Sequence, residues 1–393
     1  MSKRVYLDWN ATAPLRPAAR AAMLAALDEL GNPSSVHREG RTARRLVEGA
    51  RAEVAALVGA QPRNIVFTSG GTEANMLALT PALQLAGDRG SRDRLFVSAI
   101  EHASVRSGGR FPADCVETVA VTPEGVVDLA RLEHQLASAK QQGVIRPLVS
   151  LMAANNETGV VQPVQKAAEI VHAAGGLLHV DAVQAAGRIP LDINELQTDL
   201  VTISGHKIGG PQGVGALVRR DEALHLPDPL IKGGGQERGL RAGTENVLGL
   251  SGFGAAAADA QRELAANRTH VAELRDRLEA GLRAIASDTA IFGATVERVP
   301  NTVLFAVAGM KAETALIGLD LDGVAVSSGA ACSSGKVAPS HVLGAMGVEE
   351  KLARGAIRVS FGPATTETDI ERFLQAWRKR VDALPKDRHA IAA

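Results

Sequence analysis

The chain has 393 residues, of which 46% are hydrophobic and 22% charged, a composition typical of a soluble globular protein with two or three domains. Its formal net charge of +0 indicates neither nucleic acid nor a strongly charged protein as a partner. No apolar run approaches the roughly 20 residues of a membrane span, and the N-terminus lacks an apolar signal core, so we expect no membrane association and a cytoplasmic location.

The first two thirds of the chain alternate between short apolar strands and helical patterns. After a strand-like opening, helices are expected at 17–30 and 42–58. Strands are predicted at 65–68, 95–99, 116–119, 149–153, 176–181, 200–204 and 215–218, and helices between them at 72–86, 128–139 and 164–174. Such alternation predicts an α/β fold with a mostly parallel, seven-stranded sheet covered on both faces, where ligands bind at the carboxyl ends of strands.

The last third of the chain predicts a second, smaller α/β domain. A stretch rich in glycine and alanine, 249–260, leads into a long amphipathic helix that connects to this domain. Strands are expected at 301–306 and 356–360. The final helix begins at Thr366, and Asp369 three residues later completes a pattern typical of a capping box.

Lys207 is a lysine in an unusual setting. His206 and Lys207 are the ionisable residues between Leu200 and Leu217, so an apolar strand delivers one amine into a glycine-rich turn. Most lysines are surface charges, so one interpretation of Lys207 is an ordinary solvent-exposed lysine without a chemical role. Desolvation favours the neutral amine, which would make Lys207 a nucleophile toward a carbonyl or aldehyde.

Two other strand ends carry groups that would complete a cofactor site. The strand at 65–68 runs into Ser69, Gly70, Gly71 and Thr72 and then a helix, a junction that either caps the helix or binds a phosphate. The strand at 176–181 ends in Asp181, which is either a turn residue or a ligand-binding carboxylate. A phosphate cradle, a carboxylate and a desolvated lysine are the groups that pyridoxal phosphate requires.

With these residues in place, the sequence resembles the cysteine desulfurases, in the long-loop group of the class V aminotransferases. The resemblance runs almost end to end and is carried by these ordered motifs: Tyr6-Leu-Asp, Gly31-Asn-Pro-Ser-Ser, Phe67-Thr-Ser-Gly-Gly-Thr-Glu, Glu101-His, Asn155-Asn-Glu-Thr-Gly, His179-Val-Asp, Ser204-Gly-His-Lys, Arg241-Ala-Gly-Thr, the Ser327–Ser334 loop and Ala356-Ile-Arg-Val-Ser. It implies the type I aminotransferase fold, with a large domain at 15–258 and a small domain formed by 1–14 and 259–393.

The resemblance also implies roles for individual residues toward pyridoxal 5′-phosphate. Lys207 would be the Schiff-base lysine and Asp181 the partner of the pyridine nitrogen. His102 would stack on the ring and take part in proton transfer; the alternative is a packed histidine satisfied by neighbouring backbone. Further cofactor contacts are expected from Gly71, Thr72, Asn155, Gln184, Ser204, His206 and Thr244. Because Thr244 matches a residue that reaches the neighbouring subunit's phosphate, a homodimer with shared active sites is implied.

The small domain would carry the sulfur chemistry. The chain has two cysteines, too few for a disulfide framework, and no Cys/His cluster has metal-site spacing, so no metal is expected. Cys332 lies among small residues that make a poor core, and we expect its thiolate to be the nucleophile. Arg358 is a lone cation in an apolar strand; the alternatives are a structural ion pair and capture of a substrate carboxylate. The resemblance favours capture, with Asn32 and Asn155 as further substrate contacts.

The predicted function is removal of sulfur from L-cysteine as a persulfide on Cys332, with release of L-alanine. The persulfide would pass to a sulfur-acceptor or iron–sulfur scaffold protein. A selenocysteine lyase or an aminotransferase of the same family is the first alternative, and a non-catalytic sulfur carrier with the same fold is the second. Departures from the family pattern are Trp9-Asn10, Thr158 and Gly209; none removes a proposed functional group, and an effect on loop mobility or on the entrance is expected only for Gly209.

Overall fold

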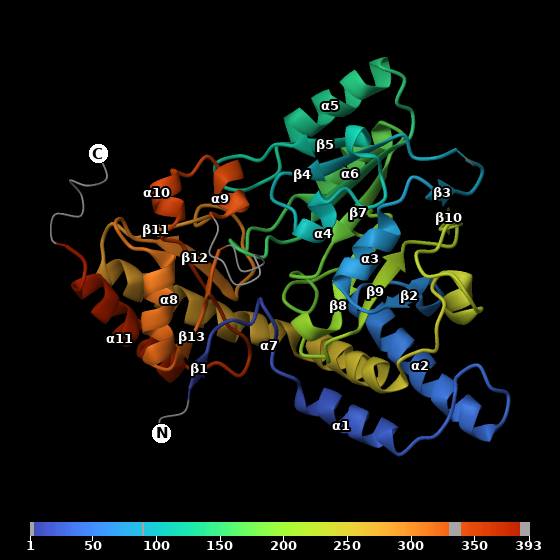
Figure 1. Ribbon diagram of the computed structural model, residues 1–393, viewed down its shortest axis with the longest axis horizontal. Helices are drawn as coiled ribbons and strands as arrows, with labels where there is room; N and C mark the ends of the chain where they lie inside the picture. The colour runs from blue at the N-terminus through green and yellow to red at the C-terminus, as the bar shows by residue number, and fades with distance from the viewer. Residues whose placement is uncertain (1–3, 89, 330–338, 386–393) are drawn as a thin grey trace.

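A computed structural model describes residues 4–88, 90–329 and 339–385 (Figure 1). Its larger sheet contains seven strands in the order β2-β9-β8-β7-β6-β4-β5. The strands are β2 (Ile65–Thr68), β4 (Arg94–Ser98), β5 (Val116–Val119), β6 (Pro147–Met152), β7 (Leu177–Asp181), β8 (Leu200–Ser204) and β9 (Gly215–Arg219). β9 is antiparallel to both neighbours, whereas adjacent strands from β8 to β5 are parallel. The prediction of a mostly parallel seven-stranded sheet is confirmed.

Helices cover both faces of this sheet. One face packs against α2 (Arg38–Leu57), α5 (Leu129–Gln141), α6 (Val164–Ala173) and the first half of α7 (Val247–Ile285). The other packs against α3 (Gly71–Ala78) and α4 (Ala103–Arg106). Successive strand side chains point to opposite faces, and because both faces of the central strands are buried, these strands are mostly apolar. α1 (Pro17–Leu27) lies outside, along α7 (Figure 1).

The helix predicted at 72–86 is shorter than expected. α3 ends at Ala78, and the chain then turns at Thr80 and Pro81 before a short strand, β3 (Gln84–Leu85), pairs with β10 (Leu224–His225). Pro81 is the physical reason, because the residue before a proline is disfavoured in the helical conformation.

A second, four-stranded antiparallel sheet forms the core of the smaller unit. Its order is β11 (Ala290–Ile291), β12 (Thr302–Ala306), β15 (Ile357–Ser360) and β14 (Ser327–Ser328). α8 (Ala312–Leu321) and α11 (Glu367–Asp382) pack on it, and α9 (His341–Ala345) and α10 (Glu350–Ala353) lie beside it. The predicted capping box at Thr366 and Asp369 is present at the start of α11.

The two units are joined by α7 and by the N-terminal segment. α7 has 39 residues; Leu250 and Phe253 pack in the core of the larger unit, and Leu274 and Leu278 in that of the smaller. β1 (Val5–Tyr6) pairs in parallel with β13 (Val324–Ala325) of the smaller unit. Figure 1 shows α7 crossing from one unit to the other. The exact domain boundaries at 15 and 258 stay a prediction. Within the described ranges, no helix is long and apolar enough to span a membrane.

Candidate active site

Lys207 and Asp181 meet at one edge of the larger sheet. Asp181 is the last residue of β7, and Lys207 lies in the single turn Gly205–Lys207 that follows β8. Since β7 and β8 are parallel neighbours, their carboxyl ends lie side by side, as the sequence predicts. Both residues line a cavity of about 340 Å³. The Lys207 amine donates hydrogen bonds to the backbone oxygens of Asn10 at 2.6 Å and Ala11 at 2.8 Å.

Most of the predicted site residues line this cavity together. They come from α3, the start of α4, the ends of β7 and β8 and the strand β15 of the smaller unit: Gly71, Thr72, His102, Asp181, Gln184, Ser204, His206, Lys207 and Arg358. The cavity is therefore shared by the two units, and the residues that meet in it are far apart in the sequence.

The start of α3 forms the predicted cradle. A Cβ atom on Gly71 would lie 3.0 Å from Val183 Cγ2 and 3.6 Å from Ser204 Cβ, so any side chain there would fill the space in front of the helix. The amide groups of the first helical turn and the hydroxyls of Thr72 and Ser204 are donors that suit a phosphate.

His206 contributes to the cavity as a neutral imidazole. Burial, together with the charges of Lys207 and Arg188, lowers its pKa to about 4. Its Nδ1 lies 3.2 Å from the Thr12 hydroxyl. A neutral ring can donate one hydrogen bond to a phosphate without adding a charge.

Asp181 belongs to a hydrogen-bond network that sequence reasoning missed. Asn75 donates from Nδ2 to Asp181 Oδ2 at 2.8 Å and to the Ser104 hydroxyl at 2.9 Å. Ser104 lies 2.8 Å from His102 Nδ1, which also accepts from the Ser104 backbone amide. Asn75 follows Thr72 by three residues on α3 and so shares its helix face, a signal that could have identified it.

A second, buried carboxyl group interacts electrostatically with Asp181. Glu101 is fully buried, and burial, with a smaller contribution from Asp181, raises its pKa well above the usual range. Its Oε1 accepts from the Met152 backbone amide at 2.6 Å. Burial therefore favours the protonated form of Glu101, which limits the negative charge beside Asp181.

Arg358 forms one of the two interactions that the sequence left open, the structural ion pair, and it also lines the cavity. Its side chain is 3% exposed and pairs with Asp8 Oδ1 at 2.8 Å, which is a structural ion pair. A second nitrogen donates to the Asn156 backbone oxygen at 3.0 Å. However, Arg358 also lines the cavity, and its Nε has no partner within the described part of the chain. A guanidinium with unused N–H donors can still donate to a carboxylate ligand, so capture of a substrate carboxylate stays a prediction.

The structure does not bring three of the predicted residues, Asn155, Asn32 and Thr244, to this cavity. Asn155 is fully buried, and its amide oxygen accepts from Glu157 and Thr158 inside its own turn; the next residue, Asn156, lines the cavity instead. Asn32 is an exposed turn residue whose side chain accepts from Ser34. Thr244 is exposed beside a separate cavity of about 240 Å³, and Cys332 lies outside the described residues.

The segment that carries Thr244 is held firmly to the larger unit. Glu237 has a positive φ of 44°, a strained conformation for a residue with a side chain. Its buried carboxylate accepts two bonds of 2.7 Å from Arg51 and one of 2.8 Å from the Phe67 backbone amide. Arg241 in turn pairs with Glu73 of α3 at 3.0 Å.

A helix N-terminus, a carboxylate and an amine at one sheet edge of an α/β fold define the class of pyridoxal phosphate-dependent enzymes. The sequence model of the class-V aminotransferases matches residues 5–373. The chain belongs to this family, whose members depend on pyridoxal 5′-phosphate.

Similar proteins carry more specific names. A cysteine desulfurase of Cereibacter sphaeroides is 44% identical over 390 residues, covering 97% of each chain. Cysteine desulfurase IscS of Dictyoglomus turgidum is 39% identical over 389 residues, covering 98% of this chain and 96% of that one. The solved NifS-like protein from Rickettsia africae is 37% identical, with a TM-score of 0.86 over 97% of this chain and 100% of that one.

The observed groups fit this cofactor. The space in front of Gly71 that a Cβ would fill suits the phosphate, Asp181 suits the ring nitrogen, and the Lys207 amine suits the aldehyde. Within the described ranges, no group of three or more His, Cys, Asp or Glu side chains is arranged to hold a metal ion.

Proposed function

We propose that this protein is a cysteine desulfurase that takes sulfur from L-cysteine and releases L-alanine. The observation that carries the proposal is the joint placement of Lys207, Asp181 and Arg358 around one cavity. The similarity to proteins named cysteine desulfurase supports the choice of substrate, and a solved relative, SspA, 28% identical with a TM-score of 0.75 over 92% of this chain and all of its own, is in complex with cysteine.

Each residue has a distinct role in this proposal. The bound cofactor supplies an electron sink that makes the Cα proton of an amino acid acidic. Lys207 holds the cofactor and, once its amine is free, moves this proton. Asp181 keeps the ring nitrogen protonated, and Arg358 binds the substrate carboxylate. The arrangement orients the amino acid between two groups that belong to different units of the fold.

Sulfur transfer is assigned to Cys332. Its thiolate attacks the substrate sulfur, so an S–S bond forms as the Cβ–S bond breaks. The electron pair of that bond stays on Cβ, which takes up a proton and becomes the methyl group of alanine. Earlier in the chain than Cys332, Ser327 on β14 pairs with Arg358 on β15 and donates to Asp8 at 2.9 Å, so β14 lies beside the site.

We further infer a homodimer with shared sites and a sulfur-acceptor protein as partner. Support for the first is the exposed position of Thr244, away from the cavity of its own chain. An acceptor for iron–sulfur cluster assembly is favoured by the likeness to a protein named IscS.

Three variants test the proposal by measuring alanine, sulfide and cofactor absorption with cysteine as substrate. Cys332→Ala should keep the absorption of the bound cofactor and lose sulfide release, because only the sulfur acceptor is removed. Lys207→Ala should lose the absorption that depends on the amine. Cys115→Ala is the matched control, since Cys115 is outside the cavity, and should change neither readout. Undiminished sulfide release by Cys332→Ala would contradict the role of its thiol, and production of a keto acid would indicate an aminotransferase.

A further inference from the structure

Residues 8–11, here called the bridging segment, hold the two cations of the site. Arg358 donates to the Asp8 carboxylate at 2.8 Å. Lys207 donates to the backbone oxygens of Asn10 and Ala11. Lys207 belongs to the larger unit and Arg358 to the smaller, so a segment of four residues connects the amine with the guanidinium.

Asn10 is the centre of this segment. It is 1% exposed, and each of its backbone and side-chain polar groups has a partner. Its backbone amide donates to Ser360 Oγ at 3.0 Å, and its side-chain amide donates to the Asn156 oxygen at 3.1 Å and to Thr302 Oγ1 at 2.9 Å. Its side-chain oxygen accepts from Arg188 at 2.9 Å and from Asn301 at 3.1 Å. A buried residue that uses all of its polar atoms has one preferred position.

A second route also connects Asn10 with Arg358. The Asn156 backbone oxygen accepts from Asn10 Nδ2 and from Arg358 Nη1 at 3.0 Å. The two donors therefore share one acceptor, and a change in the position of the guanidinium alters the hydrogen bond that orients the Asn10 amide. On the other side, Gln184 donates to the Asn10 backbone oxygen at 3.1 Å, the atom that also binds Lys207.

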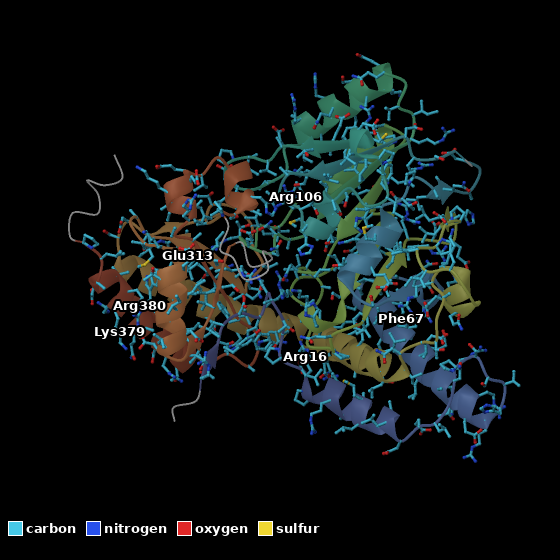
Figure 2. The ribbon with its side chains drawn as sticks, in the orientation of Figure 1. Arg16, Phe67, Arg106, Glu313, Lys379 and Arg380 are labelled. Atoms are coloured by element: carbon cyan, nitrogen blue, oxygen red, sulfur yellow. The ribbon has the colours of Figure 1, made fainter. Side chains whose placement is uncertain are left out.

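The bridging segment is fixed at both ends. At its start, Trp9 packs so closely on Gly362 that a Cβ there would lie 2.3 Å from the indole ring. Beyond its end, the Ala13 amide donates to the His206 oxygen, and Arg16 donates to the Ile208 oxygen at 2.8 Å and pairs with Glu263 of α7. Figure 2 shows Arg16 beside α7. The bridging segment is therefore anchored on both sides of Asn10.

A carboxylate that binds Arg358 draws on the same guanidinium that donates to Asp8 and to the Asn156 backbone oxygen. A shift of the guanidinium toward this carboxylate changes its bond to the Asn156 oxygen, which is also the acceptor for the Asn10 side-chain amide. We propose that the bridging segment couples the binding of a substrate carboxylate at Arg358 to the position of the Lys207 amine, with Asn10 as the positioning residue. This inference rests on the proposed function, because it requires Arg358 to bind a carboxylate.

The test uses the protein with its cofactor bound and propionate as a ligand that has a carboxylate but no amino group to replace Lys207. The absorption of the cofactor attached to Lys207 is titrated with pH, with and without saturating propionate. We expect propionate to shift the titration midpoint in the unsubstituted protein and to lose this effect in Asn10→Asp. That variant keeps the oxygen acceptors for Arg188 and Asn301 but removes both side-chain donors.

Two further variants make the test decisive. Asn10→Ala removes the same donors without adding a charge and should also lose the shift. Asn194→Ala is the matched control, because Asn194 is exposed and donates to Gly59 far from the site, and it should keep the full shift. Competition of propionate with cysteine is measured in every variant.

The outcomes separate the inference from the proposed function. An equal shift in the unsubstituted protein and in both Asn10 variants overturns the coupling, and so does propionate that competes with cysteine but shifts no midpoint. Propionate that does not compete with cysteine overturns carboxylate binding at Arg358, and with it both the inference and that part of the proposed function. Loss of the shift in both Asn10 variants, with competition retained, supports the coupling.

Discussion

Glu157 is a carboxyl group whose protonation is controlled by its position in the fold. It is 3% exposed, and burial raises its pKa to about 7 although a hydrogen bond from Ser340 and the charge of Arg358 act in the opposite direction. Between its ordinary value of 4.5 and this raised value, the folded protein keeps a proton that the unfolded chain has lost. The contribution of Glu157 to stability is therefore present below that window and is lost as the pH rises through it.

Glu157→Gln should remove this dependence, because glutamine resembles the protonated acid. Relative to the unsubstituted protein, the variant should gain stability between about pH 5 and about pH 8, by about 3 kcal/mol at most. Urea unfolding at both pH values measures the difference. His179 and His206, whose pKa values burial lowers to about 3 and about 4, act in the opposite direction but equally in both proteins. Parallel pH profiles would contradict the assignment; exposed Glu133→Gln serves as the control.

At the scale of elements, the contact between α2 and α7 depends on one glycine. A Cβ on Gly254 of α7 would lie 2.5 Å from the Ala50 Cα of α2, closer than packed atoms approach. Gly49 is the neighbouring residue on α2, but it is exposed and a Cβ there would have nothing within 4 Å. Substitutions at Gly254 and Gly49 therefore distinguish the effect of helix packing on stability from the effect of helix propensity.

Gly254→Ala should destabilise the protein by about 1–3 kcal/mol, because the two helices must separate. Gly49→Ala should instead stabilise it by about 0.5–1 kcal/mol, since alanine is the better helix former. Chemical denaturation of both variants under identical conditions provides the comparison. Equal effects in the two variants would show that the close approach of the helices does not limit stability.

The strands of the larger sheet could be predicted because their signal is local. Runs such as Ile65–Thr68 and Leu200–Ser204 are mostly apolar, fully buried and bounded by turn residues, as expected for strands buried on both faces. The predicted end of α3 was wrong because the helical periodicity of the sequence continues past Ala78. The residues that follow form a turn, since Pro81 disfavours a continued helix. Helix boundaries depend on such single residues more than on the pattern that identifies the helix.

At the scale of the whole molecule, the position of Thr244 predicts that subunits complement one another. If Thr244 serves the site of a neighbouring chain, a hybrid dimer of Thr244→Ala and Lys207→Ala subunits contains one site with both residues intact. Co-expressed, differently tagged chains should therefore give a hybrid with cysteine desulfurase activity and bound cofactor. Each parent dimer lacks one of the two residues in both of its sites.

The parent homodimers are the controls, with cofactor content and activity measured for each after purification through both tags. If the hybrid is no more active than a mixture of the separate parents, Thr244 acts in the site of its own chain or in neither site. The segment that carries Thr244 is anchored by the ion pair between Glu237 and Arg51. A local rearrangement of this segment in Thr244→Ala would therefore not explain a recovery of activity in the hybrid.

By itself, the sequence determined the class of fold, the family and the main residues of the cavity. Short motifs at strand ends indicate both the local structure and the chemical groups that it carries. Lys207 and Asp181 could be placed at one sheet edge since parallel neighbours end together. Only the tertiary structure decided that Asn75 donates to Asp181 and that Asp8 forms an ion pair with Arg358. It also decided that Asn10 contacts both Lys207 and the backbone oxygen that binds Arg358. These contacts join residues from separate elements, and no local pattern records which buried polar groups satisfy one another.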